Sequence, residues 1–464
     1  PLVQLLRPYN AVQKKWFNNP IKAINAVMDS VLNETNSIID KKQIVDILMD
    51  VSHYKFDPMM AKAIQLLSHM YNLKARMVEY AMETQVLLTA ESLALHHDIC
   101  TFMPLFRRVL LVHIRTDQAE MVNAILEKFM ECCVFKNDKE KPNKIGQHCL
   151  VNHRLVALLV ELLQRPQIKD PPKAGEEWFL FLAGNIMKLL RLMVRNNPEV
   201  QAVVFKEIDT IMAVRSCPAA QADMLCELFH YNADVSWKVS DPHVHQLVAL
   251  VSEHQEKVPQ LVSVLTSIIV ADEQGTLIKR SQTLVMKHVL RGYPKDAYVF
   301  DVPAALRSRI LLGEEGKDLL LYAVNLINLF TLCAKGNRGS IRSFCQNVFT
   351  LREILTLLLK EEISPNIKRP LLKYVTWVYL HLMSASDKTT IGNPLLKRML
   401  WQVIKTFVPD LDHCSELVNT ETVSASIMAS IEDSATPQRG DELYPATVVY
   451  YIVDAILPFL RVFC

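Results

Sequence analysis

Glycine is scarce in this chain, with 11 residues among 464, whereas proteins on average contain about 7% glycine. Folds rich in β-strands need glycine at hairpin turns and bulges, where the backbone adopts conformations that other residues avoid. The scarcity argues against a sandwich or a barrel. A Gly-rich phosphate loop is also missing, since the segment KGNRGS at 335–340 follows an apolar run rather than a strand and lacks the Walker spacing. We interpret this segment as a turn between helices.

An excess of charge is missing too. The 51 Lys and Arg against 49 Asp and Glu give a net charge of +2, so no overall field attracts nucleic acid or anionic lipid. Residues 1–10 lack the pattern of a signal peptide, and the first residue is not Met, so we expect a fragment or a processed product. No uninterrupted apolar run approaches the roughly 18 residues that span a bilayer. The longest candidates, 319–334 and 448–463, are interrupted by Asn325 and Asn328, and by Asp454, Pro458 and Arg461.

Ordered sets of catalytic residues are missing as well. The sequence has no nucleophile elbow and no protein-kinase signature, and no spacing arranges its Ser, His and acidic residues into a triad. We therefore expect no enzymatic activity. We assign no catalytic residue, no cofactor-binding residue and no metal ligand from the sequence.

Cysteine and histidine were the remaining source of candidate sites. The 10 cysteines have no regular spacing and are typical of reduced, mostly buried thiols. One group combines both residue types: Cys132, Cys133, His148, Cys149 and His153. Its first two cysteines are adjacent, whereas zinc-finger ligands are usually two to four residues apart, so we interpret the group as buried thiols and loop histidines. The pairs His96-His97 and His243-x-His245 are interpreted as structural histidines.

Helical periodicity is the dominant positive signal. From Asp57 onward the apolar residues of DPMMAKAIQLLSHMYN fall on one helix face, and the Asp-Pro pair is typical of a helix start. The same device recurs at Asn197-Pro198, Asp241-Pro242, Ser364-Pro365 and Asn393-Pro394. Thr350 to Glu353 has the capping-box pattern. Gly336 is predicted to end a helix over 319–335.

Many helices with short links and few strand signals predict an all-α fold, an armadillo- or HEAT-like α-solenoid of stacked antiparallel helix pairs. No clean repeat period is visible, so the repeats are expected to be degenerate. We expect N-terminal helical repeats over 1–135, charged and Pro-rich linkers around one helical unit over 136–176, a central solenoid over 177–380, and C-terminal repeats over 381–464. Within the last region, 420–444 is polar and is expected to be partly disordered.

A co-linear series of segments resembles the middle of inositol trisphosphate receptors. The clearest stretch is 319–380, in which LLYAVNLINLFTLCAKGNRGSI precedes the two-helix unit FTLREILTLLLKEEISPNIKRPLLKYVTWVYL. Further similar segments lie at 62–89, 154–167, 247–274, 277–290 and 296–312. The last of these is expected to form a strand-like or extended turn before a helix. The resemblance places the homology domain shared with ryanodine receptors roughly over 175–380.

This resemblance implies a cytoplasmic coupling solenoid of a homotetrameric, ligand-gated calcium-release channel of the endoplasmic reticulum. Its partners would be other domains and subunits of that channel and regulatory proteins, with no nucleic acid, and the membrane would be reached only through other parts of the parent chain. No ligand-binding β-trefoil or pore helix has a counterpart here. The alternatives are the equivalent segment of a ryanodine receptor and a free-standing HEAT-like scaffold that binds proteins.

Overall fold

The computed structural model describes residues 41–53, 56–68, 89–110, 116–135, 138–170, 178–337, 339–360, 363–381, 392–418 and 449–463. The chain forms two units, residues 1–86 and 87–464. In the first unit, the described residues form helix α3 (Lys41–Val51) and a helix at 57–68, which starts at the Asp-Pro pair predicted to start it. Most of the segment 62–89 lies outside the described residues.

The described residues of the second unit are mostly helical. Its helices up to the middle of the chain are α5 (Ala90–Leu110), α6 (Thr116–Cys132), α7 (Lys144–Asn152), α8 (Leu155–Leu163), α9 (Pro166–Lys169), α10 (Trp178–Val194), α11 (Pro198–Phe205), α12 (Ile208–Met212), α13 (Pro218–Phe229), α14 (Ala233–Lys238) and α15 (Asp241–His254). The following ones are η1 (Gln255–Lys257), α16 (Gln260–Ile269), α17 (Lys279–Gly292), η2 (Lys295–Phe300), α18 (Ala304–Leu312), α19 (Lys317–Ala334), α20 (Ser340–Val348), α21 (Leu351–Leu358), α22 (Pro365–Tyr374), η3 (Val375–Leu380), α24 (Pro394–Val418), η4 (Ile452–Ile456) and α27 (Leu457–Phe463).

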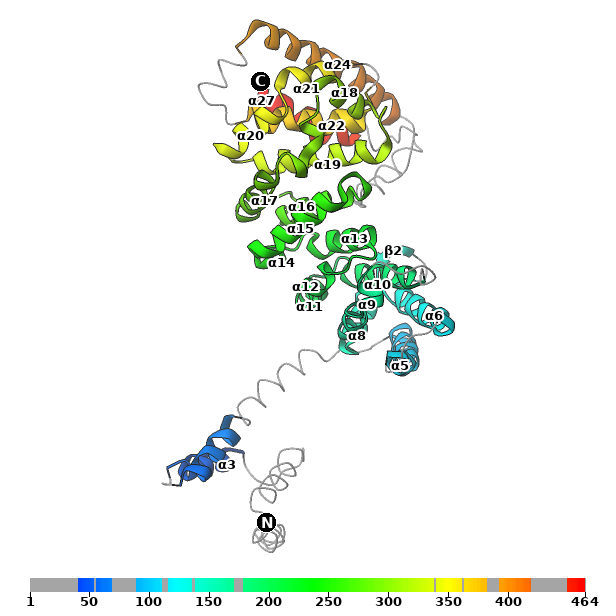
Figure 1. Ribbon diagram of the computed structural model, residues 1–464, viewed down its shortest axis with the longest axis vertical. Coiled ribbons are helices and arrows are strands. Elements are labelled where there is room, and N and C mark those ends of the chain that lie inside the picture. Colours follow the sequence, from blue (N-terminus) through cyan, green and yellow to red (C-terminus); the bar gives the residue numbers. More distant parts are fainter. Residues whose placement is uncertain are drawn as a thin grey trace, which may run out of the picture. The chain divides into compact units, whose positions relative to one another are not determined.

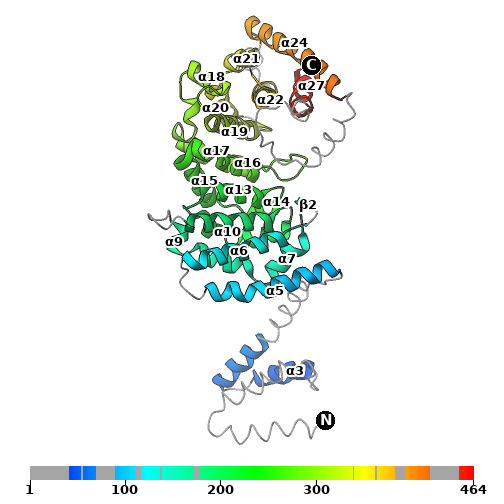
Figure 2. The same cartoon turned by 90° about the vertical axis from the view of Figure 1, so that its right-hand side faces the viewer.

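These helices stack as successive repeats, and we call the first helix of each repeat its long helix, although α16, with 10 residues, is shorter than α17, with 14. The long helices form a continuous row in which α6 packs on α10, then α13, α16, α19 and α22 follow in order, each against the one before. The second helices form another row, α7, α11, α14 and α17, and the third helices α8, α12 and α15 form a third. Figures 1 and 2 show this stack rising in chain order from α5 to α21. The fold is therefore the predicted all-α solenoid, and its middle repeats carry a third helix.

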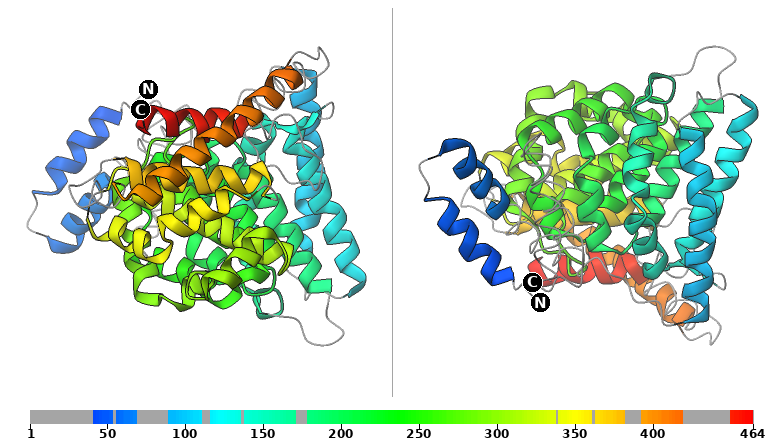
Figure 3. Two further views of the ribbon diagram at one scale, coloured as in Figure 1. Left: turned by 90° about the horizontal axis from the view of Figure 1, so that it is seen from above. Right: turned by 90° about the horizontal axis from the view of Figure 1, so that it is seen from below.

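The two ends of the stack are closed differently. At the first end, α5 lies beside α6 and packs on α7 and α8 (Figure 3). A short antiparallel hairpin of β1 (Val134–Phe135) and β2 (Asp138–Pro142) follows α6, where a charged linker was predicted. At the other end, α24 packs on α21, while η4 and α27 pack on α22 and η3.

The predicted helix boundaries agree well with the structure where it describes them. Asn197 caps α11, Ser364 precedes α22 and Thr350 forms a capping box with Glu353. The Asp241-Pro242 pair lies one residue further into its helix than predicted, because Ser240 is the N-cap of α15. Segment 296–312 holds the 3₁₀ turn η2 before α18 rather than an extended turn. Within the linker region predicted over 136–176, residues 166–169 form α9, and residues 171–176 lie outside the described residues. Segment 420–444, predicted to be partly disordered, also lies outside them.

Helix α19 is the core element of the stack. Of the described helices, it is the one long and apolar enough to cross a membrane by length and composition. It packs between α16 and α22, and half of its apolar window is buried inside the protein. A helix that is apolar on several faces and has helical neighbours on both sides is typical of a solenoid core, so its hydropathy is explained by packing.

Candidate functional site

The junctions between successive repeats carry a recurring pair of buried amide side chains. At the first junction, Gln147 of α7 is fully buried and its Nε2 donates hydrogen bonds to the carbonyls of Leu192 and Arg195, at 2.8 and 3.0 Å. Asn197 closes the set, because its Nδ2 donates to Gln147 Oε1 at 2.9 Å. Gln147 therefore ties the second helix of one repeat to the end of the long helix of the next, and we call this arrangement an amide latch.

The latch supplies hydrogen-bond donors to the carbonyls at a buried helix end. The last carbonyls of a helix have no partner within it, and a buried carbonyl without a hydrogen bond is costly. Asn196 leaves α10 in the left-handed conformation, with φ of 51°. This turn brings Asn197 to the N-cap of α11, where its side chain accepts from the amide of Val200 at 3.4 Å. Asn197 thus starts one helix while its amide nitrogen binds the latch of the previous repeat.

The second junction repeats the arrangement one repeat further along. Gln201 of α11 is buried and donates to the carbonyls of Glu227 and His230, at 2.7 and 3.3 Å. Asn232, the N-cap of α14, donates to Gln201 Oε1 at 2.8 Å. The residue before it, Tyr231, has φ of 51°, so the same left-handed exit ends the long helix.

The junction between α17 and α19 has the same latch. Gln282 is buried and donates to the carbonyls of Leu332 and Lys335, at 2.6 and 3.0 Å. Asn337 donates to Gln282 Oε1 at 3.3 Å and follows Gly336, whose φ is 77°. In all three latches the two carbonyls are three residues apart and the Asn follows two residues after the second. The predicted helix stop at Gly336 is confirmed and belongs to this motif.

An arginine replaces the glutamine at the last junction. Arg342 of α20 is buried, and its Nη2 donates to the carbonyl of Tyr379 at 2.8 Å while its Nε donates to that of Val378 at 2.6 Å. These carbonyls belong to the end of η3. A guanidinium offers more donors than an amide, so it can fill the same role with a longer reach.

One junction lacks the latch. Each latch glutamine lies four residues after the N-cap of its helix: Asn143 and Gln147, Asn197 and Gln201, Ile278 and Gln282. In α14 the corresponding residue after Asn232 is Ser236, which is buried and whose Oγ has no hydrogen-bond partner. The N-cap of the next second helix, α17, is Ile278 rather than asparagine. Both members of the latch are therefore replaced at the same junction.

The end of α16 is satisfied by its own loop instead. A tight turn brings the backbone back, so that the amide of Ile278 donates to the carbonyl of Ile269 at 2.9 Å, and that of Ala271 to the carbonyl of Thr276 at 2.8 Å. The turn uses Gly275 with φ of 74° and Asp272, whose carboxylate accepts from the amide of Thr276 at 3.0 Å. This loop ties α16 to the start of α17, not to the preceding repeat.

The structure separates the Cys and His group that the sequence had suggested. Cys133 and Cys149 are buried, as expected for structural thiols, and burial raises the pKa of both. His148 lies elsewhere, with its Nε2 at 3.2 Å from Asn197 Nδ2 and 3.5 Å from Glu199 Oε2. His243 accepts from the amide of Ser240 at 3.2 Å and caps α15. It has the structural role predicted for that pair.

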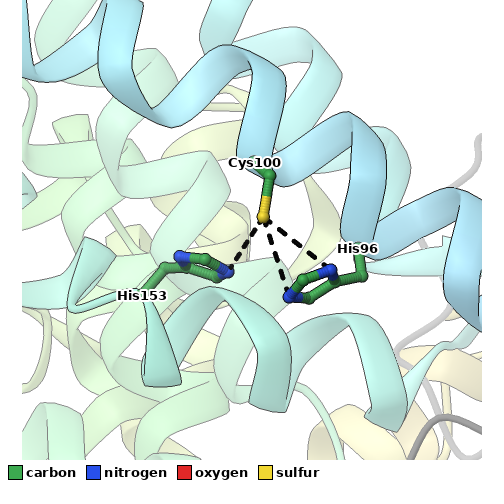
Figure 4. A group of neighbouring side chains, drawn as sticks. All are labelled: His96, Cys100 and His153. Atoms are coloured by element: carbon green, nitrogen blue, oxygen red, sulfur yellow. Dashed lines mark hydrogen bonds between the residues drawn. The ribbon is translucent and has the colours of Figure 1, made fainter.

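His153 takes part in a different cluster, which the sequence did not suggest. The side chains of His96 and Cys100 on α5 meet His153, the C-cap of α7 (Figure 4). One potential ligand atom from each of the three side chains lies within 4.8 Å of the other two. Burial lowers the pKa of His153, and the neighbouring His96 and Arg107 lower it further. The sequence signal that could have indicated this cluster is the spacing of His96 and Cys100, since residues four apart share a helix face.

The sequence also missed the latches, although their signal was present. Asparagine caps followed four residues later by glutamine occur at Asn143 and Asn197, but an Asn-x-x-x-Gln pattern is common by chance. The carbonyl partners of these two glutamines are 26 to 48 residues away in the chain. Only the stacked helices show what the amides bind.

A comparison with protein-family models finds one match within this region. Residues 111–297 match the model of the RIH domain. The matched range begins and ends earlier than the region of roughly 175–380 in which the resemblance placed this homology domain. It contains the latches of Gln147 and Gln201, the junction at Ser236 and the glutamine at 282. The four repeats from α6 to α17 are therefore the part of the stack that this domain defines.

Proposed function

Because residues 111–297 form a RIH domain, this chain belongs to the ryanodine and inositol trisphosphate receptor family, and we propose that it is a coupling solenoid of an intracellular calcium-release channel, of the inositol trisphosphate receptor type. In this role the segment would transmit a conformational change from a ligand-binding part of the parent protein to its pore. It would do so as a mechanical element, without catalysis.

The amide latches are the observation that supports this role. A solenoid whose repeats touch only through apolar side chains can slip, since such contacts have little direction. Each latch adds three directed hydrogen bonds across a junction, and their buried partners have no water to replace them. Rotation of one repeat is thereby passed to the next. Stacked repeats that contact mainly their neighbours are suited to transmit rigid-body motion.

The same proposal gives the partners and the location. The solenoid would lie on the cytoplasmic face of the endoplasmic reticulum membrane and contact other domains and subunits of a tetrameric channel. Exposed apolar side chains in two regions favour a partner-bound state over a free chain. Large apolar side chains are exposed on the first unit, at Ile47, Phe56 and Ile64, and on α24, at Trp401 and Val408. A free-standing protein-binding scaffold and the equivalent ryanodine receptor segment are the alternatives.

The test compares a latched junction with the unlatched one in a full-length receptor that contains this segment. Gln282→Ala removes the amide that joins α17 to α19, whereas Ser236→Ala removes a hydroxyl without a hydrogen-bond partner. Ligand binding and calcium release are measured on microsomes with equal receptor content. We expect ligand affinity to be unchanged in both and calcium release to fall in Gln282→Ala alone.

Two results would refute the coupling role. Normal release by Gln282→Ala at normal expression would show that the junction does not carry the signal. A loss of ligand binding that equals the loss of release would point to general misfolding. The parent reading frame separates the scaffold alternative from both receptor types, because only a receptor would encode a C-terminal pore.

A further inference from the structure

The cluster of His96, Cys100 and His153 has the composition and spacing of a zinc site. The Sγ atom of Cys100 lies 3.7 Å from both ring nitrogens of His96 and 3.8 Å from Nε2 of His153. Zinc binds sulfur at about 2.3 Å and imidazole nitrogen at about 2.0–2.1 Å in tetrahedral geometry, which separates the two ligand atoms by about 3.6 Å. Both sulfur–nitrogen distances are close to that separation.

We propose that His96, Cys100 and His153 bind one Zn²⁺ ion between α5 and the α7–α8 turn. Thiolate and imidazole are the ligands that zinc prefers, whereas calcium and magnesium bind oxygen. With three protein ligands the fourth position stays open to water or to a ligand from outside. The site therefore resembles exchangeable zinc sites more than the closed four-ligand sites of zinc fingers.

Local structure holds all three side chains in place. His96 and Cys100 are four residues apart on α5 and so lie on one face. His153 is fixed by a sharp exit from α7, where the amide of Arg154, with φ of 59°, donates to the carbonyl of Val151 at 2.8 Å.

A second contact holds the same two elements together. Arg107 lies in the last turn of α5, and its Nη2 donates to the carbonyl of His153 at 3.1 Å. The pairing of α5 with the turn is thus set before any metal binds, which reduces the ordering cost of the site. One adjustment is required. Because both nitrogens of His96 are equally distant from the sulfur, its ring must turn about χ2 to direct a lone pair at the ion, and that torsion is soft for histidine.

The bound ion would lock the first helix of the second unit to the RIH domain. His96 and Cys100 precede the matched range 111–297, whereas His153 lies within it. Zinc would therefore restrict movement of α5 relative to the first repeat of the RIH domain. This inference does not depend on the coupling function, since it concerns a metal and two packed elements.

Zinc uptake by the full 464-residue chain, reduced and freed of metal by a chelator, tests the proposal. Zn²⁺ is titrated by calorimetry, and Co²⁺ is used as an optical probe, because a tetrahedral cobalt–thiolate site gives a charge-transfer band and strong visible bands. Cys100→Ser and His153→Ala remove ligands. His97→Ala is the matched control, since His97 is an exposed neighbour on the same helix.

We expect one Zn²⁺ per chain in the parent protein and in His97→Ala. Each ligand variant should lose more than about 100-fold in affinity, because even the outer partners of a metal site contribute about 10- to 100-fold. The cobalt charge-transfer band should vanish in Cys100→Ser and disappear from the parent chain when zinc is added. Zinc should also slow the alkylation of Cys100 by iodoacetamide, mapped by mass spectrometry. Cys100 is the exposed one of the cysteines that the structure describes.

The opposite results overturn the proposal. Equal zinc uptake by the parent chain and by Cys100→Ser would place the metal elsewhere, and absence of uptake by the parent chain would leave the cluster a mere contact of side chains. Thermal unfolding of the metal-free variants and of the parent protein tests whether the substitutions disturb the fold. All three side chains are at least partly exposed, so their removal leaves the core intact and metal-free variants should melt with the parent.

Discussion

The junction between α13–α14 and α16–α17 differs from its neighbours in one respect. Before and after it, a buried glutamine spans the repeats and an asparagine completes the set. At this junction Ser236 and Ile278 stand in those two places, and the end of α16 is satisfied by a local turn. Apolar packing of the long helices continues unbroken through it. Packing and directional bonding are thus separate properties of the stack.

The difference indicates where the solenoid bends. Apolar contacts resist separation but tolerate small rotations, whereas a set of buried hydrogen bonds has a single satisfied geometry. The repeats joined by Gln147 and Gln201 should move as one block, and those joined by Gln282 and Arg342 as another. The four predictions below test this difference, from the largest expected effect to the smallest.

The first prediction concerns the block after the bend. Arg307 of α18 is buried and donates to the carbonyls of Phe300, Val302 and Val348, each at 2.9 Å. Arg307→Ala should lower the free energy of unfolding by about 3–5 kcal/mol, because three carbonyls lose their donor and two of these hydrogen bonds are buried. Chemical denaturation measures this. Arg309→Ala on the same helix breaks exposed ion pairs with Glu314 and Glu315. It should cost less than about 1 kcal/mol, and equal losses would contradict the account.

The second prediction removes one latch. Gln282→Ala leaves the carbonyls of Leu332 and Lys335 without their donor, and should cost about 2–3 kcal/mol. Hydrogen exchange should increase near the end of α19 and the start of α20 while the block before the bend keeps its protection. Gln274→Ala, an exposed glutamine in the nearby turn, is the control and should change neither quantity. Uniform loosening of the whole stack would show that the junctions are not independent.

The third prediction concerns charge at the far end of the stack. Burial alone would raise the pKa of Asp454 on η4, but attraction to Lys373 and Arg369 of α22 outweighs it, so the pKa lies below its usual value. A lowered pKa stabilises the fold above the carboxyl's unfolded pKa, and this contribution is lost as the pH falls through the folded pKa.

Asp454→Asn should therefore destabilise the chain by about 1 kcal/mol at neutral pH, since the pair is partly exposed. The difference from the parent protein should shrink toward acidic pH, as the parent carboxylate becomes protonated. Thermal unfolding of both proteins as a function of pH measures the two effects. A difference that stays constant through the acidic range would assign the loss to packing instead of charge.

The smallest effect is expected at the bend. Ser236→Ala removes a buried hydroxyl that has no partner, so the free energy of unfolding should change by less than about 0.5 kcal/mol or rise slightly. Denaturation curves of this variant and of Gln282→Ala, measured together, compare the two kinds of junction directly. A large loss in Ser236→Ala would mean that the hydroxyl has a role that its surroundings do not show.

Helix positions and fold class followed from the sequence alone. Asn197-Pro198, Thr350 to Glu353 and Gly336 marked helix ends correctly because capping depends on residues next to each other in the chain. The apolar faces predicted a stacked all-α architecture for the same reason. The repeat period was hidden, since the connections between helices differ in length, such as the two residues that follow α14 and the hairpin that follows α6.

The tertiary structure decided everything that joins distant residues. Gln282 finds its carbonyl partners some 50 residues ahead, and His153 meets Cys100, 53 residues before it. No local rule assigns such partners, because an amide or an imidazole on a helix surface suits solvent, core or ligand equally well. The stacking of neighbouring repeats brings these groups within reach of one another, and the cost of burying an unpaired polar group then selects the partner. Thus the sequence determined which helices form, and the stack determined which of their polar side chains act together.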